Sequence, residues 1–355
     1  MTATLAQSQA ILKVRYPDGR LPKAVYRTFK YTSTVKKRED FRGKSRVVAL
    51  QNENPQGSSA DFQMALGSMQ QGVYNAFDVT RVEHFGIARI KGQALRAAEG
   101  DEGALVDLWK NETDGISMTE TQNLEIYAFG NGSGTKGQFA VGQTFTTTSV
   151  TLRNTTDILK FALNERVQVV SDATLSPTLR TGGPGRITAI DRKTGTITLA
   201  PAWNSIFTDP ALAANDYLVR AGDFASAGAA SVIMGIQGWI VGGTTPGTLF
   251  TLNRNSDPVR LAGQVHDCTG TSIEESIIDA SSEVAEQGAP QPEDAWIHPR
   301  TLAKFKKALG GKVEYERASI KSLTAGVSFK AIIIEGDDGD IKLMTSPFVS
   351  LTDIP

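Results

Sequence analysis

The sequence has 355 residues, with 37 Lys or Arg against 38 Asp or Glu and a formal net charge of −1. This length suffices for two or three structural units, each with its own core. No run approaches the ~18 consecutive apolar residues of a membrane-spanning helix, and the first residues lack the pattern of a secretory signal. The single cysteine, Cys268, excludes an internal disulfide and a multi-cysteine metal cage, and it favours a protein made in a reducing cytoplasm.

The charge is distributed unevenly along the chain. Residues 1–50 carry 12 Lys or Arg against 3 Asp or Glu, a net +9, and the rest of the chain carries 25 bases against 35 acids, a net −10. Two interpretations stay open: a solvated arm, or a segment that docks on acidic helices of neighbouring subunits or lines a lumen filled with nucleic acid. The basic interface candidates are Lys36, Lys37, Arg38, Arg42, Lys44 and Arg46.

Residues 36–98 follow an arm that has little periodicity. The pattern predicts a strand at Arg46–Leu50 and a short helix at Asp61–Gln71 that the aspartate can cap. From residue 77 onward, β-branched and aromatic residues favour extended structure. His84 is interpreted as a partly buried packing residue rather than a metal ligand, because no second donor lies near it in the sequence.

One long acidic helix is predicted from Asp101 to Phe129. Apolar residues recur there at roughly helical spacing, and the glycine-rich segment 130–134 ends the run. Seven acids stand against Lys110 alone, so this stretch carries a net −6. A helix charged on one flank and apolar on the other is typical of a strut with a solvated or partner-facing side. The acidic interface candidates are Asp101, Glu102, Asp107 and Glu112.

The amino-acid composition changes after the glycine-rich segment. Several short stretches are rich in Thr and Val. They include two strands joined by the turn at residues 192–195 and another strand near Tyr217. This pattern predicts a small antiparallel barrel or sandwich over residues 137–222. From residue 225 the chain is mixed α/β: a helix over 271–287 that Gly288 stops, a buried strand at residues 295–297, a helix opened by Pro299, and a C-terminal hairpin.

The order of these segments resembles that of major capsid proteins of tailed bacteriophages with the Hong Kong 97 fold. The resemblance is carried by "LRAAEGDEGALVDLWKNETDGISMTETQNLEIYAFGNGSG", which is similar to the family's spine-helix region, and by "PQPEDAWIHPRTLAKFKKALGG", which is similar to its axial and peripheral domains. It implies an α+β fold with an N-terminal arm at 1–35, an extended loop and return strand at 36–98, a spine helix with part of the peripheral domain at 99–136, an inserted small β-barrel at 137–222, an axial domain with peripheral elements at 223–328, and a C-terminal hairpin at 329–355.

The resemblance also implies a function. It identifies the chain as a non-enzymatic coat protein, without cofactor or metal, that self-assembles through pentamers and hexamers into an icosahedral shell around double-stranded DNA. Scaffold, portal and decoration proteins would be further partners, no membrane would be involved, and the location would be the virion capsid, assembled in the host cytoplasm.

The sequence leaves two alternatives to the coat-protein function. The first is an encapsulin-like compartment shell that encloses a cargo enzyme, and the inserted domain argues against it. The second is an enzyme whose ligand lies in the barrel, which would need a converging polar site. His266 and Cys268 could suggest a nucleophile with its base, but a packed thiol is the preferred interpretation because no third orienting group is identifiable. The aspartates at 337, 338 and 340 fit a solvated hairpin tip better than a calcium loop.

The basic and acidic candidates lead to a testable prediction. If the basic segment pairs with the acidic helix of an adjacent subunit, reversing Arg38, Arg42 and Arg46 to Glu should block shell assembly and leave a folded monomer. Electron microscopy and circular dichroism of the purified variant would measure both, and normal shells from it would refute the pairing.

Overall fold

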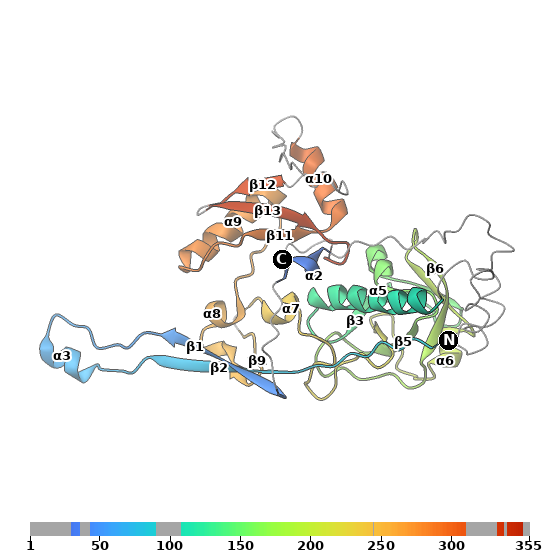
Figure 1. Cartoon of the computed structure of the whole chain (residues 1–355), viewed down its shortest axis with the longest axis horizontal. Coiled ribbons are helices and arrows are strands. Elements are labelled where there is room, and N and C mark those ends of the chain that lie inside the picture. Colours follow the sequence, from blue (N-terminus) through green and yellow to red (C-terminus); the bar gives the residue numbers. More distant parts are fainter. Residues whose placement is uncertain are drawn as a thin grey trace. The chain divides into compact units, whose positions relative to one another are not determined.

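The computed structural model describes residues 30–35, 43–89, 108–243, 245–309, 332–336 and 339–350 (Figure 1). The chain divides into two compact units. The first comprises Met1–Lys36 and Glu83–Ile126, and the second comprises Lys37–Val82 and Tyr127–Pro355. The structure is mixed α+β with several separate sheets, which confirms the predicted fold class at that level.

The predicted acidic helix is present as α5 (Leu108–Ala128), and residues 101–107 lie outside the described part of the chain. Threonines and Gly115 in its middle do not interrupt it. The hydroxyl of Thr119 donates to the carbonyl of Gly115 (3.0 Å) and that of Thr121 to the carbonyl of Ser117 (2.9 Å), so these side chains bond to the helix itself. The predicted glycine-rich stop follows, with Gly132 at φ 84°. The first unit also contains the short helix α2 (Tyr31–Thr34).

The region predicted as a barrel forms a six-stranded antiparallel sheet in the order β3-β8-β5-β6-β7-β4. The 3-10 helix η2 (Thr155–Lys160) and the helix α6 (Trp203–Ile206) lie between its strands along the chain. The strands are β3 (Thr135–Gln138), β4 (Ser149–Thr151), β5 (Arg166–Val170), β6 (Gly185–Asp191), β7 (Thr196–Leu199) and β8 (Tyr217–Arg220). The predicted turn at residues 192–195 does join two strands, β6 and β7.

This sheet is not the closed barrel that the sequence predicted. Its edge strands β3 and β4 meet only at an isolated bridge between Phe139 and Leu152. Between these strands the chain turns at Gly142, which has φ 76°, and β4 has only three residues. Strand β3 begins at Thr135, two residues before the predicted start of this region at residue 137.

The sheet encloses a core of aliphatic and aromatic side chains. Trp203 is fully buried, with its ring at right angles to that of Phe139 (centroids 5.4 Å apart) and stacked with that of Phe207 (5.7 Å). Its indole nitrogen donates to the carbonyl of Thr148 (3.0 Å), so the one polar atom of the ring is satisfied. The other members of this core are Val150, Leu152, Ile158, Phe161, Val167, Val169, Ile187, Ile197, Leu199 and Leu218.

A three-stranded sheet lies in the C-terminal part of the chain, with the strand order β11-β13-β12. Strands β11 (Asp294–Ile297) and β13 (Asp340–Thr345) are parallel, and β12 (Ile332–Glu335) pairs with β13 in the antiparallel sense. The predicted helices are α9 (Ile273–Glu286) and α10 (Pro299–Leu309). A reciprocal capping box between Ser272 and Glu275 starts α9.

Short elements connect the two sheets along the chain. They are α7 (Ile236–Trp239), β9 (Thr248–Leu249), β10 (Leu252–Asn253), the 3-10 helix η3 (Arg254–Ser256) and α8 (Pro258–Ala262). The guanidinium of Arg254 is buried and donates to the carbonyls of Gly238 (3.3 Å), Trp239 (3.0 Å) and Pro246 (3.1 Å). One side chain therefore holds α7 and the loop before β9 together.

The burial of Trp203 leads to a stability prediction. Trp203→Ala should lower the free energy of unfolding by about 3–5 kcal/mol, because it leaves a cavity in the core. Urea unfolding followed by circular dichroism measures this. Leu163→Ala, at a side chain that is 58% exposed, is the matched control and should change stability by no more than about 0.5 kcal/mol.

Candidate assembly interface

A long β-hairpin of the second unit (Figure 1) carries a group of exposed apolar side chains. Its strands are β1 (Ser45–Glu53) and β2 (Val73–Thr80), paired from Ser45 opposite Thr80 to Glu53 opposite Val73. The predicted strand at residues 46–50 is therefore confirmed and is longer than expected. Residues 54–72 form the end of the hairpin and are called the tip below.

The tip contains one helix, α3 (Phe62–Gly67). Asp61 caps it as predicted, accepting a hydrogen bond from the amide of Met64 (3.0 Å), but the helix ends at Gly67 rather than at residue 71. Gln56 and Gln70 close the tip through two reciprocal backbone hydrogen bonds of 3.0 and 2.9 Å. The tip thus has a defined backbone with very few stabilising contacts of its own.

None of the residues of α3 is buried. Phe62 is 74% exposed and Met64 is 70% exposed, and Leu66 and Met69 are exposed as well. Val47, Val48, Val73 and Tyr74 on the strands are also exposed. An isolated two-stranded ribbon and a six-residue helix are each marginal in water. An apolar surface of this kind indicates a contact with another molecule.

The tip is almost free of charge. Among residues 54–72 the only ionisable side chain is Asp61, and it already serves as a helix cap. The residues predicted for the interface are charged, and this apolar surface was not predicted from the sequence. The signal that could have revealed it is a run of large apolar residues without Lys, Arg or Glu inside a segment predicted to be a loop.

An aromatic clamp holds strand β2. The ring of Phe77 lies edge-on to that of Trp239 (centroids 5.3 Å apart), and Trp239 lies against Phe250 (5.4 Å). The amide of Asp78 donates to the carbonyl of Phe250 (3.0 Å). Phe250 and Thr251, in the turn between β9 and β10, have φ of 46° and 73°, a conformation that side chains other than glycine rarely adopt. Such strain persists where surrounding contacts fix it, and here it accompanies the docking of β2.

A polar clamp holds strand β1. Arg260 of α8 donates to the carboxylate of Glu53 (2.7 Å) and to the carbonyl of Asn52 (3.2 Å). Asp257 caps α8 and so fixes the helix that carries the arginine. Arg260 and Glu53 are each about half exposed, so this pair contributes modestly to stability. Together the two clamps hold both strands against the β9 to α8 region and leave the tip unsupported.

The structure describes only three of the predicted interface residues. Lys44 is exposed just before β1, Arg46 is half-buried within β1, and Glu112 is partly exposed near the start of α5. The other predicted residues lie outside the described part of the chain: Lys36, Lys37, Arg38, Arg42, Asp101, Glu102 and Asp107. The pairing of basic segment and acidic helix therefore stays a prediction.

His84 was predicted to be a partly buried packing residue rather than a metal ligand, and the structure gives it a carboxylate partner. Its Nδ1 lies 2.5 Å from Oε2 of Glu120 on α5, and both side chains are 30% exposed. Gly86 lies equally close to the helix, because a Cβ there would stand 2.9 Å from side-chain carbons of Ile116 and Glu120. The segment after β2 therefore runs along α5, and His84 and Gly86 both contact that helix.

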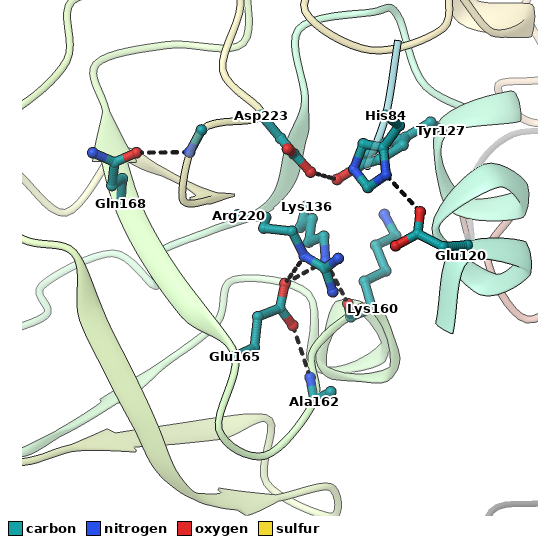
Figure 2. A network of polar contacts seen from close by, with 11 residues as sticks. His84, Glu120, Tyr127, Lys136, Lys160, Ala162, Glu165, Gln168, Arg220 and Asp223 are labelled. Atoms are coloured by element: carbon teal, nitrogen blue, oxygen red, sulfur yellow. Dashed lines mark hydrogen bonds and ion pairs between the residues drawn. The ribbon is translucent and has the colours of Figure 1, made fainter. Parts of the chain in front are cut away.

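A buried ionic cluster joins several segments of the second unit (Figure 2). Nζ of Lys136 in β3 lies 2.5 Å from Oε1 of Glu165, and Nε of Arg220 in β8 lies 3.0 Å from the same oxygen. The amide of Ala162 donates to the other carboxylate oxygen (2.9 Å). The hydroxyl of Tyr127, at the end of α5, donates to Asp223 (2.5 Å) just after β8.

The surroundings set the pKa values of this cluster. Burial lowers the pKa of Lys136, and Glu165 opposes that shift. Burial alone would raise the pKa of Glu165, but Lys136 and Arg220 outweigh it and hold the pKa below its ordinary value. Burial and Asp223 raise the pKa of Tyr127, so its hydroxyl stays protonated as a donor. With Lys136 and Glu165 at 0% and 3% exposure, the geometry supports a structural joint between β3, β5 and β8.

The other polar candidates do not form a site. Cys268 is exposed, so the interpretation of a packed thiol is wrong. His266 bonds through Nδ1 to Glu283 (2.7 Å), while the thiol of Cys268 donates to the backbone carbonyl of His266 (3.8 Å). Asp340 begins β13, and residues 337 and 338 lie outside the description. Within the described ranges, no three His, Cys, Asp or Glu residues are grouped so that they could hold a metal ion.

Comparison of the chain with protein-family models, with curated proteins and with solved structures found no match. Among the helices that the structure describes, none combines the length and apolar character needed to cross a membrane.

The aromatic clamp predicts a local change in dynamics. Trp239→Ala removes two ring contacts worth about 0.5–1.5 kcal/mol each, so the amides of β2 should exchange hydrogen about tenfold faster. Hydrogen exchange followed by mass spectrometry on the dilute subunit measures this. Tyr74→Ala, at a 69% exposed aromatic of the same strand, should leave the exchange unchanged. Equal protection in the Trp239 variant would show that the ring contacts do not hold β2.

The ionic cluster predicts an acid-dependent stability. Because the folded-state pKa of Glu165 lies below its ordinary value of 4.5, its carboxylate stabilises the fold above that value. This contribution is lost as the pH falls through the lowered pKa. Unfolding midpoints in urea should therefore fall more steeply below pH 4.5 for the parent chain than for Glu165→Gln. At neutral pH that variant should be less stable by about 3–5 kcal/mol, because two buried cations lose their partner.

Proposed function

We propose that this chain is a major capsid protein, which self-assembles into the icosahedral head shell of a tailed bacteriophage and encloses its double-stranded DNA. The observation that carries the proposal is the clamped hairpin with an exposed apolar tip, whose only ionisable side chain is the helix cap Asp61. A monomeric protein gains nothing from holding such an apolar surface out in water, whereas a shell subunit covers it with a neighbour.

The order of elements supports the same function. An extended hairpin precedes the long helix α5, which ends in a glycine-rich turn, and a mixed α/β region follows at the C-terminal end. This is the order of the capsid family that the sequence resembles, with the Hong Kong 97 fold as the proposed architecture. The six-stranded sheet between α5 and the mixed region would be an inserted domain.

The proposed mechanism is geometric. The hairpin and arm of each subunit lie across neighbours, and the mixed α/β region clusters around the vertices as pentamers and hexamers. Individual contacts are modest, but a subunit held on several sides gains from multivalency. The basic N-terminal segment would face acidic neighbours or packaged DNA. Scaffold, portal and decoration proteins are the further partners proposed, the location is the virion, assembled in the host cytoplasm, and the role is non-enzymatic, without cofactor.

Electron microscopy of the purified protein, with the ratio of absorbance at 260 and 280 nm, tests the proposal. Uniform shells with nucleic-acid absorbance are the expected result for particles from the native source. Shells that enclose a protein cargo and no nucleic acid would instead favour a compartment of the encapsulin type. A monomer at all concentrations would contradict both shell functions.

The tip predicts which substitutions stop assembly. Met64→Glu combined with Met69→Glu places two carboxylates on a tip whose only ionisable side chain is the helix cap Asp61, so shells should be lost while circular dichroism and the unfolding midpoint stay those of the parent. Val141→Glu, at a side chain that is 76% exposed outside the hairpin, is the matched control and should still assemble. Shells formed equally well by the double variant would contradict the role given to the tip.

A further inference from the structure

A row of basic side chains lies on the exposed face of helix α10. Arg300, Lys304 and Lys307 are all exposed, and their spacing of four and then three residues places them on one side of the helix. The row extends for about 10 Å along the helix axis. Helix α10 contains no acidic residue, so nothing within it offsets this charge. These three residues are called the basic row below.

The other side of the helix is anchored in the fold. Phe305 is buried in the same core as Ile297 of β11 and Leu343 of β13. The buried ring of His298 accepts a hydrogen bond from the amide of Arg300 through Nδ1 (3.1 Å), which satisfies one of the free amides at the start of the helix. The basic row therefore projects from a backbone that the core and the cap hold in place.

The basic row lacks an acidic partner within the part of the chain that the structure describes. None of its three side chains forms an ion pair there. Like charges three and four residues apart destabilise a helix. Arg300 also lies in the first turn, where the helix macrodipole favours acidic residues. A bound anion would offset both effects.

The surroundings of the basic row narrow the class of partner. Among residues 299–308 the other exposed positions are Pro299, Ala303 and Ala308. These positions include no aromatic ring on which the bases of single-stranded nucleic acid could stack. They also include no large apolar side chain that could enter a membrane surface. Small residues beside the row allow the helix to approach a charged polymer closely.

We propose that the basic row binds the phosphate backbone of double-stranded DNA. The inference rests on the proposed function, and it names a surface of the subunit that meets the enclosed DNA. Duplex DNA carries one negative charge for every ~1.7 Å of its axis, so a row about 10 Å long faces several phosphates in any register. Phosphate contacts carry no sequence information, which suits a shell that encloses a whole genome.

The acidic helix α9 of a second copy is the other partner that charge would allow. This helix carries five acidic residues and no basic one. Two of the five already serve its own fold. Glu275 completes the capping box, and Glu283 accepts a hydrogen bond from Gln264 (2.6 Å) and pairs with His266 (2.7 Å). Because the acidic helix is partly engaged within its own chain, DNA is the better match for the basic row.

Fluorescence anisotropy of the full chain with a labelled DNA duplex of about 20 base pairs tests the proposal. The test variant combines Arg300→Gln, Lys304→Gln and Lys307→Gln. Its affinity at about 0.1 M NaCl should fall at least about tenfold, because three phosphate contacts are lost. The slope of log affinity against log salt concentration should become shallower by about 2–3.

A charge-matched control removes three other exposed bases. It combines Arg153→Gln, Arg166→Gln and Lys193→Gln, all in the region of the six-stranded sheet. This variant loses the same charge and should keep the slope of the parent chain. Both variants retain the basic N-terminal segment, so its contribution is the same in each. Equal losses of affinity and slope in the two variants would overturn the proposal.

Protection of lysines locates the contact on the parent chain itself. The duplex should slow acetylation of Lys304 and Lys307 at least about threefold and leave Lys193 unchanged, as measured by mass spectrometry. Unchanged acetylation of the two α10 lysines would contradict the proposed contact. Protection that appears at high protein concentration without DNA would assign the basic row to a second copy and overturn the proposal too.

The outcome for the basic row is separable from that for the capsid function. Shells from the parent chain, with a DNA affinity that the α10 substitutions leave unchanged, would keep the capsid proposal and overturn this one. Loss of DNA binding in the α10 variant of a chain that never forms shells would support the DNA contact and contradict the capsid function.

Discussion

A two-stranded ribbon has no core of its own, so its shape depends on what holds its strands and on what covers its end. In this chain two different contacts hold the strands. The ring of Phe77 lies edge-on to that of Trp239, and the guanidinium of Arg260 bonds to the carboxylate of Glu53. The strained turn at Phe250 is part of the first contact, because its carbonyl accepts the amide of Asp78. Local backbone strain thus accompanies the contacts that fix the direction of the ribbon, while the apolar side chains at its end stay exposed.

Much of the fold could be predicted from local sequence signals. The turn between β6 and β7, the cap at Ser272 and the proline that opens α10 each act within a few residues, so periodicity and turn chemistry suffice. The closed barrel was predicted wrongly for a reason of the same kind. The run of Thr and Val around residue 145 has strand propensity, but the chain turns at Gly142 and β4 has only three residues.

The features that sequence reasoning missed depend on distant parts of the chain meeting. Lys136, Glu165 and Arg220 are far apart in sequence and converge only because β3 and β5 both pair with β8. His84 bonds to Glu120, which requires the segment after β2 to lie along α5. The tip was not predicted as an interface because its six helical residues are too few to show a helical hydrophobic periodicity, and because its main property is a low content of charged residues.

The exposed tip also limits the lifetime of a free subunit. In a copy that has not assembled as proposed, Phe62 and Met64 stand in water at 74% and 70% exposure on a segment whose only ionisable side chain, Asp61, serves as a helix cap. Such a segment adheres to any apolar surface, including partly folded chains that leave the ribosome. Under the proposed function, assembly therefore competes with aggregation, and the rate of synthesis relative to the rate of capture by neighbouring subunits would decide the yield of assembled protein.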